Sequence, residues 1–281
     1  MPTYTNKYNI PSRIIRMLPT SHRPVEGRYS VTDLVADPLP RTLLLEKWDE
    51  LIIDYADMLL VVQGIALHEK AEKAVESDEE AETKFEDVID GVTIVGKADN
   101  YIPAEKTIVD TKQTGVWSPT YPDWIAKVTA QLNCYASQRL KRDYLVKKLV
   151  ADVFYRDHSI TKSLRTQNYP PIAYQEIEIT LWPFEKQEQY IKDQIELHTI
   201  NAHKECSMVQ KMQRFNVKKK GRITPLKVCD TFLEAQIYVE NYVREEGIKP
   251  NLVTAELSEP LACMYYCKAR SCCPYAKRLS K

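Results

Sequence analysis

Two short runs rich in β-branched residues constrain the fold of this chain more than any other feature. They cover residues 92–99 (VTIVGKAD) and 106–112 (KTIVDTK), with Pro103 in the segment between them. Residues 122–140 then begin with Pro and Asp and follow a helical period, and residues 145–155 return to a strand pattern. We therefore expect a β-hairpin, followed by a crossover helix that places a further strand beside the hairpin.

Helical patterns flank this hairpin unit. From about Arg41 to Ser77, hydrophobic residues recur at intervals of three and four, which predicts a helix with one apolar face. Another strand is predicted at 174–182, and helices at about 184–212 and 230–246 are separated by a basic segment. This order of elements predicts a mixed α/β fold, with a mixed central sheet flanked by helices.

The pattern also suggests three regions. They are an irregular, Pro-rich N-terminal arm (1–40), an α/β core (41–182) and a helical C-terminal extension with a Cys-rich basic tail (183–281).

Composition narrows the class of protein. The 281 residues are 44% hydrophobic, and 39 basic side chains balance 39 acidic ones, which excludes a chain that is mainly disordered. The longest apolar stretch is too short to span a membrane, and the N-terminus has no apolar signal region, so we expect a cytoplasmic protein with no membrane partner. Charge is locally uneven: residues 211–228 carry seven basic side chains and no acid, which could bind phosphate groups.

The predicted hairpin carries two carboxylates and a lysine. Asp99 ends the first run, and Asp110 and Lys112 lie two apart at the end of the second, so they point to the same face of a strand. Such a set could hold a divalent cation on oxygen ligands, with the lysine acting on a water molecule. A surface hairpin with ordinary polar residues is the alternative, since the pattern D/E-x-K is common: residues 82–84 (ETK) repeat it.

Two further pairs lie at helical spacing. Gly64 and His68 are four residues apart upstream, and Gln131 and Tyr135 are four apart on the helix after the hairpin. An imidazole could complete a mixed nitrogen and oxygen site for Mg²⁺ or Mn²⁺. Taken singly, a histidine at the polar end of an apolar helix is more often a packed or capping residue, and a helical tyrosine is more often part of the core.

The order G-x₃-H, D, D-x-K, Q-x₃-Y resembles the RecB-like branch of the PD-(D/E)XK nucleases, which includes AddB-type helicase-nucleases and CRISPR-associated exonucleases. The resemblance covers about residues 30–182 and implies a restriction-endonuclease-like core. It implies that His68, Asp99, Asp110 and the carbonyl of Thr111 bind Mg²⁺ or Mn²⁺. It also implies that Lys112 activates water, and that Gln131 and Tyr135 help to place DNA and the lysine. Family members commonly carry Glu where this chain has Asp110.

Four of the seven cysteines lie close together near the C-terminus: Cys263, Cys267, Cys272 and Cys273. Many RecB-like nucleases hold a [4Fe-4S] cluster on three such cysteines and one N-terminal cysteine, but no cysteine precedes Cys134 here. Several alternatives stay open. The fourth ligand could come from Cys134, Cys206, Cys229 or the adjacent pair, the metal could be Zn²⁺, or the thiols could bind no metal.

These features together predict a metal-dependent deoxyribonuclease, an exonuclease rather than an endonuclease, that acts in DNA processing or recombination. DNA is the expected partner, together with a helicase, an annealing protein or another recombination protein, and phage genomes are one setting for such chains. The alternative is a nuclease fold without catalysis that serves in DNA binding or protein assembly. Retention of both acids and the lysine favours the enzyme, because a protein that only binds DNA has no need of them.

Overall fold

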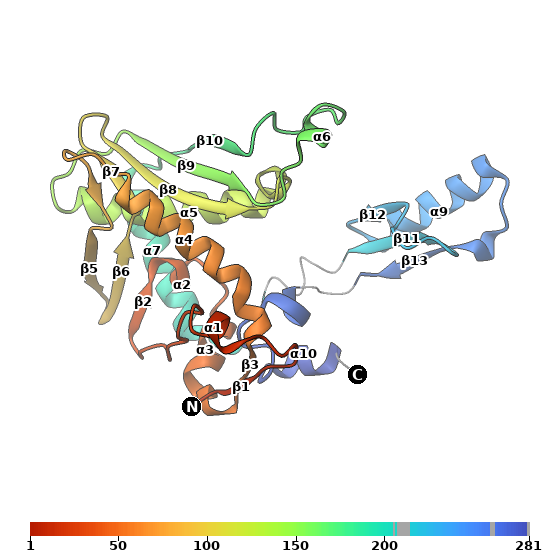
Figure 1. Ribbon diagram of the computed structural model, residues 1–281, viewed down its shortest axis with the longest axis horizontal. Coiled ribbons are helices and arrows are strands. Elements are labelled where there is room, and N and C mark those ends of the chain that lie inside the picture. The colour runs from red at the N-terminus through yellow and green to blue at the C-terminus, as the bar shows by residue number, and fades with distance from the viewer. Residues whose placement is uncertain (205, 207–213, 259–261, 280–281) are drawn as a thin grey trace. The chain divides into compact units, whose positions relative to one another are not determined.

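The structure, a computed structural model, describes residues 1–204, 206, 214–258 and 262–279. The chain divides into two compact units, Met1–His203 and Lys204–Lys281 (Figure 1). This division differs from the boundaries at 40 and 182 that the sequence suggested. Residues 31 and 34 of the N-terminal arm, and residues 191 and 195 beyond the core, belong to the hydrophobic core of the first unit.

A mixed sheet of five strands organises the first unit. In spatial order the strands are β10 (Tyr174–Ile179), β9 (Lys148–Tyr155), β8 (Thr107–Thr114), β7 (Asn100–Ile102) and β4 (Glu80–Ala81). The central strand β8 runs antiparallel to β7 and parallel to β9, and the helix α5 (Pro122–Leu140) makes the crossover that a parallel pair requires. The predicted mixed α/β architecture and the crossover from hairpin to strand are therefore confirmed.

The pairing of the predicted hairpin was wrong. Residues 92–97 form β6, which belongs to a separate sheet of three strands, between β2 (Arg28–Ser30) and β5 (Lys84–Ile89). The hairpin partner of β8 is instead the short strand β7. The chain leaves one sheet and enters the other at residues 98–99, so Asp99 lies at the junction between the two sheets.

The single helix predicted from Arg41 to Ser77 was also wrong. The segment contains the helix α3 (Pro38–Glu46), the strand β3 (Ile52–Asp54) and the helix α4 (Leu59–Lys73). The break occurs because β3 pairs in parallel with the N-terminal strand β1 (Thr3–Thr5), a distant partner that no local pattern reveals. The remaining short elements of this unit are α1 (Ser12–Ile15), α2 (Val31–Leu34), α6 (Ile160–Ser163) and 3₁₀ turns at Trp48–Glu50, Tyr55–Met58 and Ser118–Thr120.

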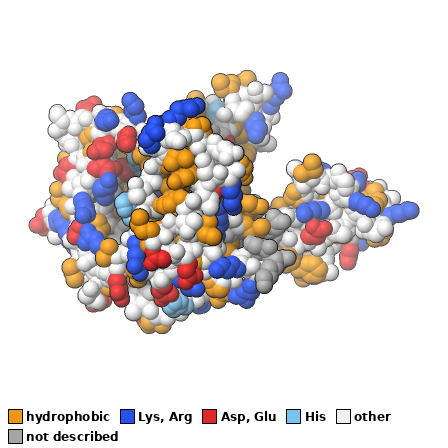
Figure 2. Space-filling view, turned by 60° about the horizontal axis from the view of Figure 1, so that its bottom comes forward, with side chains coloured by type: hydrophobic (Ala, Val, Ile, Leu, Met, Phe, Trp, Pro, Cys, Tyr) orange, Lys and Arg blue, Asp and Glu red, His pale blue; other side chains and the backbone are white. Residues whose placement is uncertain are grey.

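The helix α4 is less buried than its apolar pattern predicts. None of its residues is buried, and Leu60, Val61 and Ile65 are among the large hydrophobic side chains that remain exposed. Hydrophobic side chains also form a band on the face of the molecule that Figure 2 shows. α4 lies along β8 and so extends across the region where the predicted site residues gather (Figure 1).

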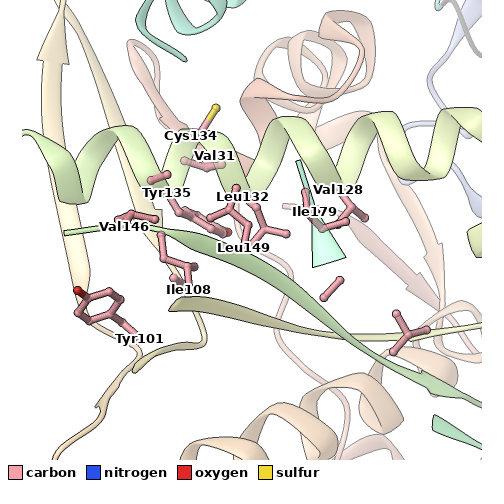
Figure 3. Packing of buried hydrophobic residues seen from close by; sticks show 14 of the residues in the cluster. Val31, Tyr101, Ile108, Val128, Leu132, Cys134, Tyr135, Val146, Leu149 and Ile179 are labelled. Atoms are coloured by element: carbon pink, nitrogen blue, oxygen red, sulfur yellow. The ribbon is translucent and has the colours of Figure 1, made fainter. Parts of the chain in front are cut away.

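The helix α5 is the centre of the hydrophobic core. Val128, Leu132 and Tyr135 point from α5 toward Ile108 and Leu149 of the central strands (Figure 3). The helix α7 (Phe184–Ile200) packs against α5 and adds Ile191 and Ile195 to the same cluster. Burial of so many large apolar side chains fixes the position of α5, and therefore of the polar residues that α5 carries.

Close approach of β6 to α5 requires glycine at position 96. A Cβ atom there would lie 1.7 Å from Oε1 of Gln138 and 3.2 Å from Cδ1 of Tyr135. Gln138 cannot move out easily, because it is 1% exposed and its Nε2 donates to the Ile94 carbonyl at 3.2 Å. We expect Gly96→Ala to lower the free energy of unfolding by about 1–3 kcal/mol, as overpacked cores do, which a thermal melt measures as a lower Tm.

The matched control for this substitution is Gly64→Ala. A Cβ at Gly64, inside α4, meets no atom within 4 Å, so alanine should leave the unfolding free energy unchanged or raise it by about 0.5–1 kcal/mol through helix propensity. Equal melting temperatures for the two variants would contradict the tight contact of β6 with α5.

The second unit is not mainly helical, which corrects the prediction for residues 183–281. Its described residues include three antiparallel strands in the order β12 (Lys227–Cys229), β11 (Phe215–Lys219) and β13 (Val253–Leu257). The helix α9 (Phe232–Glu246) covers this sheet around Val217, Cys229, Ala235 and Val253. A 3₁₀ turn (Pro250–Leu252), a π-helical turn (Ala262–Tyr266) and the helix α10 (Pro274–Leu279) complete the described elements. Among the described residues, no helix is both long enough and apolar enough to cross a membrane.

Candidate active site

The middle of β8 carries the two charged residues of the D-x-K pattern. Asp110 and Lys112 point to the sheet face that α5 covers, and Nζ of Lys112 lies 2.5 Å from Oδ2 of Asp110. Asp110 is only 2% exposed, and this burial is the main cause that raises the pKa of its carboxyl group. A second positive charge beside a carboxylate that is buried in this way would stabilise its ionised form.

Asp99 reaches β8 from the junction of the two sheets. Its Oδ2 accepts a hydrogen bond of 2.7 Å from the backbone N–H of Thr111. Since Asn100 pairs with Val109 across the β7–β8 hairpin, one further step along the antiparallel ladder places Asp99 opposite Asp110. The two acids therefore meet as the sequence predicted, although the hairpin that joins them is β7–β8.

His68 approaches the same carboxylate from α4. Its Nδ1 lies 3.2 Å from Oδ2 of Asp99, and this hydrogen bond is the main cause that raises the pKa of the imidazole. Asp110 is near enough to contribute to that shift, although it makes no contact with His68 that brings it into one group with Asp99. Gly64, one helical turn earlier, has open space around its Cα, so packing gives no reason for a glycine there.

Gln131 and Tyr135 form a relay behind Lys112. Nζ of Lys112 donates to Oε1 of Gln131 at 3.1 Å, and Nε2 of Gln131 donates to the hydroxyl of Tyr135 at 2.9 Å. Both α5 residues are buried, with 6% of each exposed. Burial raises the pKa of the Tyr135 phenol, so the hydroxyl stays protonated at neutral pH. These hydrogen bonds direct the Lys112 side chain toward α5.

Glu82 is a site residue that the sequence analysis missed. Ligand atoms of His68, Glu82 and Asp99 all lie within 4.8 Å of one another, and the carboxylate of Glu82 forms an ion pair with Lys97. The Glu82 N–H donates to the Asp99 carbonyl at 3.1 Å, which supports a left-handed backbone with φ of 53° at this glutamate. In the sequence Glu82 belongs only to a repeat of the common D/E-x-K pattern, and no local signal distinguishes it within an acidic stretch.

A buried arginine holds the strand that leads to Glu82. Arg139 of α5 is 1% exposed, and its Nη1 donates to Oε2 of Glu80 on β4 at 2.9 Å. The guanidinium also lies over the rings of Tyr101 and Tyr144, 4.3 and 4.9 Å from their centroids. This set of contacts connects the edge strand β4 to α5, and so places Glu82 next to Asp99.

The donor set suits a hard divalent cation. The ligand atoms of His68, Glu82 and Asp99 lie within 4.8 Å of one another, and Asp110 lies beside this group without belonging to it. Oxygen-rich sets of this kind fit Mg²⁺ or Mn²⁺. Lys97 and Lys112 offset only part of the negative charge. A cation would therefore be drawn to the space between these side chains.

The cysteine sulfurs of the C-terminal tail lie farther apart than the ligand atoms of the carboxylate site. All seven cysteines lie in the described residues, and no disulfide joins any of them. Burial raises the pKa of the Cys267 thiol, with a further contribution from Cys273, so these two lie near each other. No three cysteine sulfurs of the described chain lie within 4.8 Å of one another. Cys134 is a core residue of the first unit, where burial raises its pKa to about 12.

Comparisons with known proteins give only distant likenesses. No family model and no curated protein matches the chain. Among solved structures, the chain is similar to SSO0001, with 20% identity and a TM-score of 0.41 over 63% of this chain and 79% of that one. It is also similar to a phage-related exonuclease from Haemophilus somnus 129PT, with 19% identity and a TM-score of 0.31 over 50% of this chain and 70% of the other. The site therefore rests on the geometry of this chain's own residues.

Proposed function

We propose that this chain is a metal-dependent nuclease with a RecB-like PD-(D/E)XK core. One set of contacts supports the proposal: Lys112 lies against Asp110 on β8, and Asp99 contacts both His68 of α4 and the Thr111 N–H of β8. A bound cation can generate a nucleophile from water and stabilise charge on a phosphate, and a neighbouring lysine can orient that water. The first unit, from Met1 to His203, supplies all of these residues.

The proposed mechanism assigns a task to each side chain. His68, Asp99, Asp110 and the Thr111 carbonyl would hold Mg²⁺ or Mn²⁺, which when bound lowers the pKa of water and stabilises negative charge on the phosphate. Lys112 orients the attacking water through its Nζ and assists its deprotonation. Gln131 and Tyr135 keep Lys112 in that direction, because their hydrogen bonds define its rotamer.

DNA is the proposed substrate, and exonuclease action is proposed over endonuclease action. A helicase, an annealing protein or another recombination protein is the proposed partner. Release of acid-soluble nucleotides from uniformly labelled DNA tests the function, and a protein that binds DNA without releasing nucleotides would be the non-catalytic alternative.

Glu82 is proposed as a further ligand of the cation. In the absence of metal, its carboxylate is paired with the ammonium group of Lys97. We expect Glu82→Gln to raise the apparent dissociation constant for Mn²⁺ about tenfold or more, because a charged ligand is lost. Lys97→Ala should act in the opposite direction, since it removes the competing ammonium. Calorimetric titration with Mn²⁺ measures both effects.

The matched control is Glu105→Gln, an exposed acid in the β7–β8 turn. Its Mn²⁺ affinity should equal that of the unaltered protein. Equal affinities for Glu82→Gln and Glu105→Gln would show that Glu82 serves only as the ion-pair partner of Lys97.

For the tail, we propose that Cys263, Cys267 and one or both of Cys272 and Cys273 bind a structural metal, either a [4Fe-4S] cluster or Zn²⁺. Cys206 and Cys229 both belong to the same unit and are buried, so either is the proposed fourth ligand if the adjacent pair supplies only one. Iron and zinc content of anaerobically purified protein tests this, and Cys267→Ser should remove the metal. Protein free of both metals would contradict it.

A further inference from the structure

We propose that a pocket beyond the end of β8 receives an unstacked base of the substrate strand next to the site of cleavage. This inference rests on the proposed nuclease function and adds the class of substrate. The pocket has a volume of about 470 Å³, within the usual range of about 300–1,000 Å³ for small-molecule sites. It lies among the segment after β8, the start of α5 and the strands β9 and β10, with Trp117, Ile125, Tyr155 and Gln175 in its lining.

The pocket opens on the sheet face that carries the catalytic residues. Asp110, Lys112 and Thr114 point to one face, and Thr114 pairs in parallel with Tyr155. Val153, which pairs with Lys112, is also opposite Gln175 on β10. Tyr155 and Gln175 therefore share the face of Lys112. Two residues of strand, about 7 Å, separate Lys112 from Thr114 beside the pocket. A strand whose phosphate lies at the catalytic residues can thus reach the pocket with a neighbouring base.

The chemistry of the lining fits a base and not a phosphate. None of its described lining residues is Lys or Arg, so the lining supplies no charge to balance a phosphate. Trp117 is 42% exposed and offers a ring for stacking. The side-chain amide N–H groups of Gln175 can donate to the edge of a base, because its Oε1 already accepts from Tyr155. Stacking on aromatic rings is the common way in which proteins bind single strands without reading sequence.

The walls of the pocket are already held in place. The N–H of Val116 donates to Oδ1 of Asp157 at 2.8 Å, and the rings of Trp117 and Tyr169 meet edge to face with centroids 5.8 Å apart. The Tyr155 hydroxyl donates to Oε1 of Gln175 at 2.5 Å. A preformed pocket binds with little loss of conformational entropy.

A base can enter this pocket only if it has left its stack. Paired DNA would have to open by about one base pair at the end, whereas a single strand offers its bases without that cost. The inferred substrate is therefore single-stranded DNA, or the frayed end of a duplex.

The test uses the non-cleaving Asp110→Asn protein and single-stranded oligonucleotides with one abasic site, moved stepwise along the strand. We expect a loss of affinity of about tenfold when the missing base is the one that the pocket receives, and little loss elsewhere. Adding Trp117→Ala should weaken binding of the intact strand by about the same factor and remove the dependence on abasic position. Trp117→Phe should retain most of the binding, because it keeps an aromatic ring.

Phe154→Ala is the matched control, since Phe154 is a 37% exposed aromatic residue that alternates with Tyr155 and points to the opposite sheet face. Its affinity should not change. Uniform affinity at every abasic position, or equal effects of Trp117→Ala and Phe154→Ala, would contradict the binding of a base in the pocket. The proposed nuclease function would remain, because the protein would still bind the strand. Failure of the Asp110→Asn protein to bind any strand would overturn the proposed function and the pocket together.

Discussion

Asp110→Asn is expected to abolish cleavage, with a loss of about 10³-fold or more, while DNA binding survives. The carboxylate charge serves the cation, and metal stabilisation of the transition state is worth several kcal/mol. Asn keeps the size of the side chain, so the fold should persist in a site where Asp110 is almost fully buried. Initial rates of nucleotide release, measured beside a thermal melt, check both parts.

Asp152→Asn is the matched control for this substitution. Asp152 pairs with Thr111 on the adjacent strand and accepts a hydrogen bond from the Tyr174 hydroxyl at 2.7 Å. Asn offers the same acceptor, and residues that pair with Thr111 face away from the site. Its cleavage rate should stay unchanged. If Asp110→Asn retained the full rate with an intact fold, Asp110 would not be a metal ligand.

Lys112→Ala is expected to slow cleavage by about 10²-fold or more and to leave Mn²⁺ affinity largely intact. The loss is the scale of acid–base assistance to an attacking water. Lys112 lies 2.5 Å from Asp110, so its removal takes away one positive charge and should not weaken the attraction of a cation. Cleavage rates at saturating Mn²⁺, set against a calorimetric titration, separate chemistry from metal binding.

Lys148→Ala provides the comparison for Lys112, because Lys148 lies at the start of β9 in an exposed ion pair with Glu176. Exposed pairs contribute little, so its rate and stability should hardly change. If Lys112→Ala cleaved at saturating Mn²⁺ as fast as the unaltered protein, Lys112 would have no part in the mechanism.

The local sequence pattern predicts a helix or strand correctly where the side chains that it marks as apolar are the ones that become buried. The helix predicted at 122–140 has those bounds in the structure, because Pro122 begins it and its apolar face packs on the sheet. The strands at 145–155 and 174–182 occur as β9 and β10 with slightly shorter bounds. Gln131 and Tyr135 lie on the helix at 122–140, and Asp110 and Lys112 lie on the strand that was predicted at 106–112 and occurs as β8.

Other elements and site residues could not be predicted, because they depend on contacts with residues far away in the sequence. β5 lies in the acidic stretch, and one of its inward side chains is Asp87, which is paired with Arg142 at 2.8 Å. That charge hides the alternation that identifies a strand. Glu82 enters the site because Arg139 holds Glu80, 59 residues away. In the second unit, Lys218 and Lys219 mask β11 in the same way that acids mask β5.

End-labelled single- and double-stranded DNA, incubated with Mg²⁺, with Mn²⁺ or with EDTA, tests the central claim most directly. The unaltered protein should shorten the labelled strands from their ends with either metal and leave them intact in EDTA, and Asp110→Asn should leave them intact in all three. A single strand should be the better substrate. Cleavage that persists in EDTA, or that is the same for Asp110→Asn and the unaltered protein, would contradict a metal-dependent nuclease built on His68, Asp99, Asp110 and Lys112.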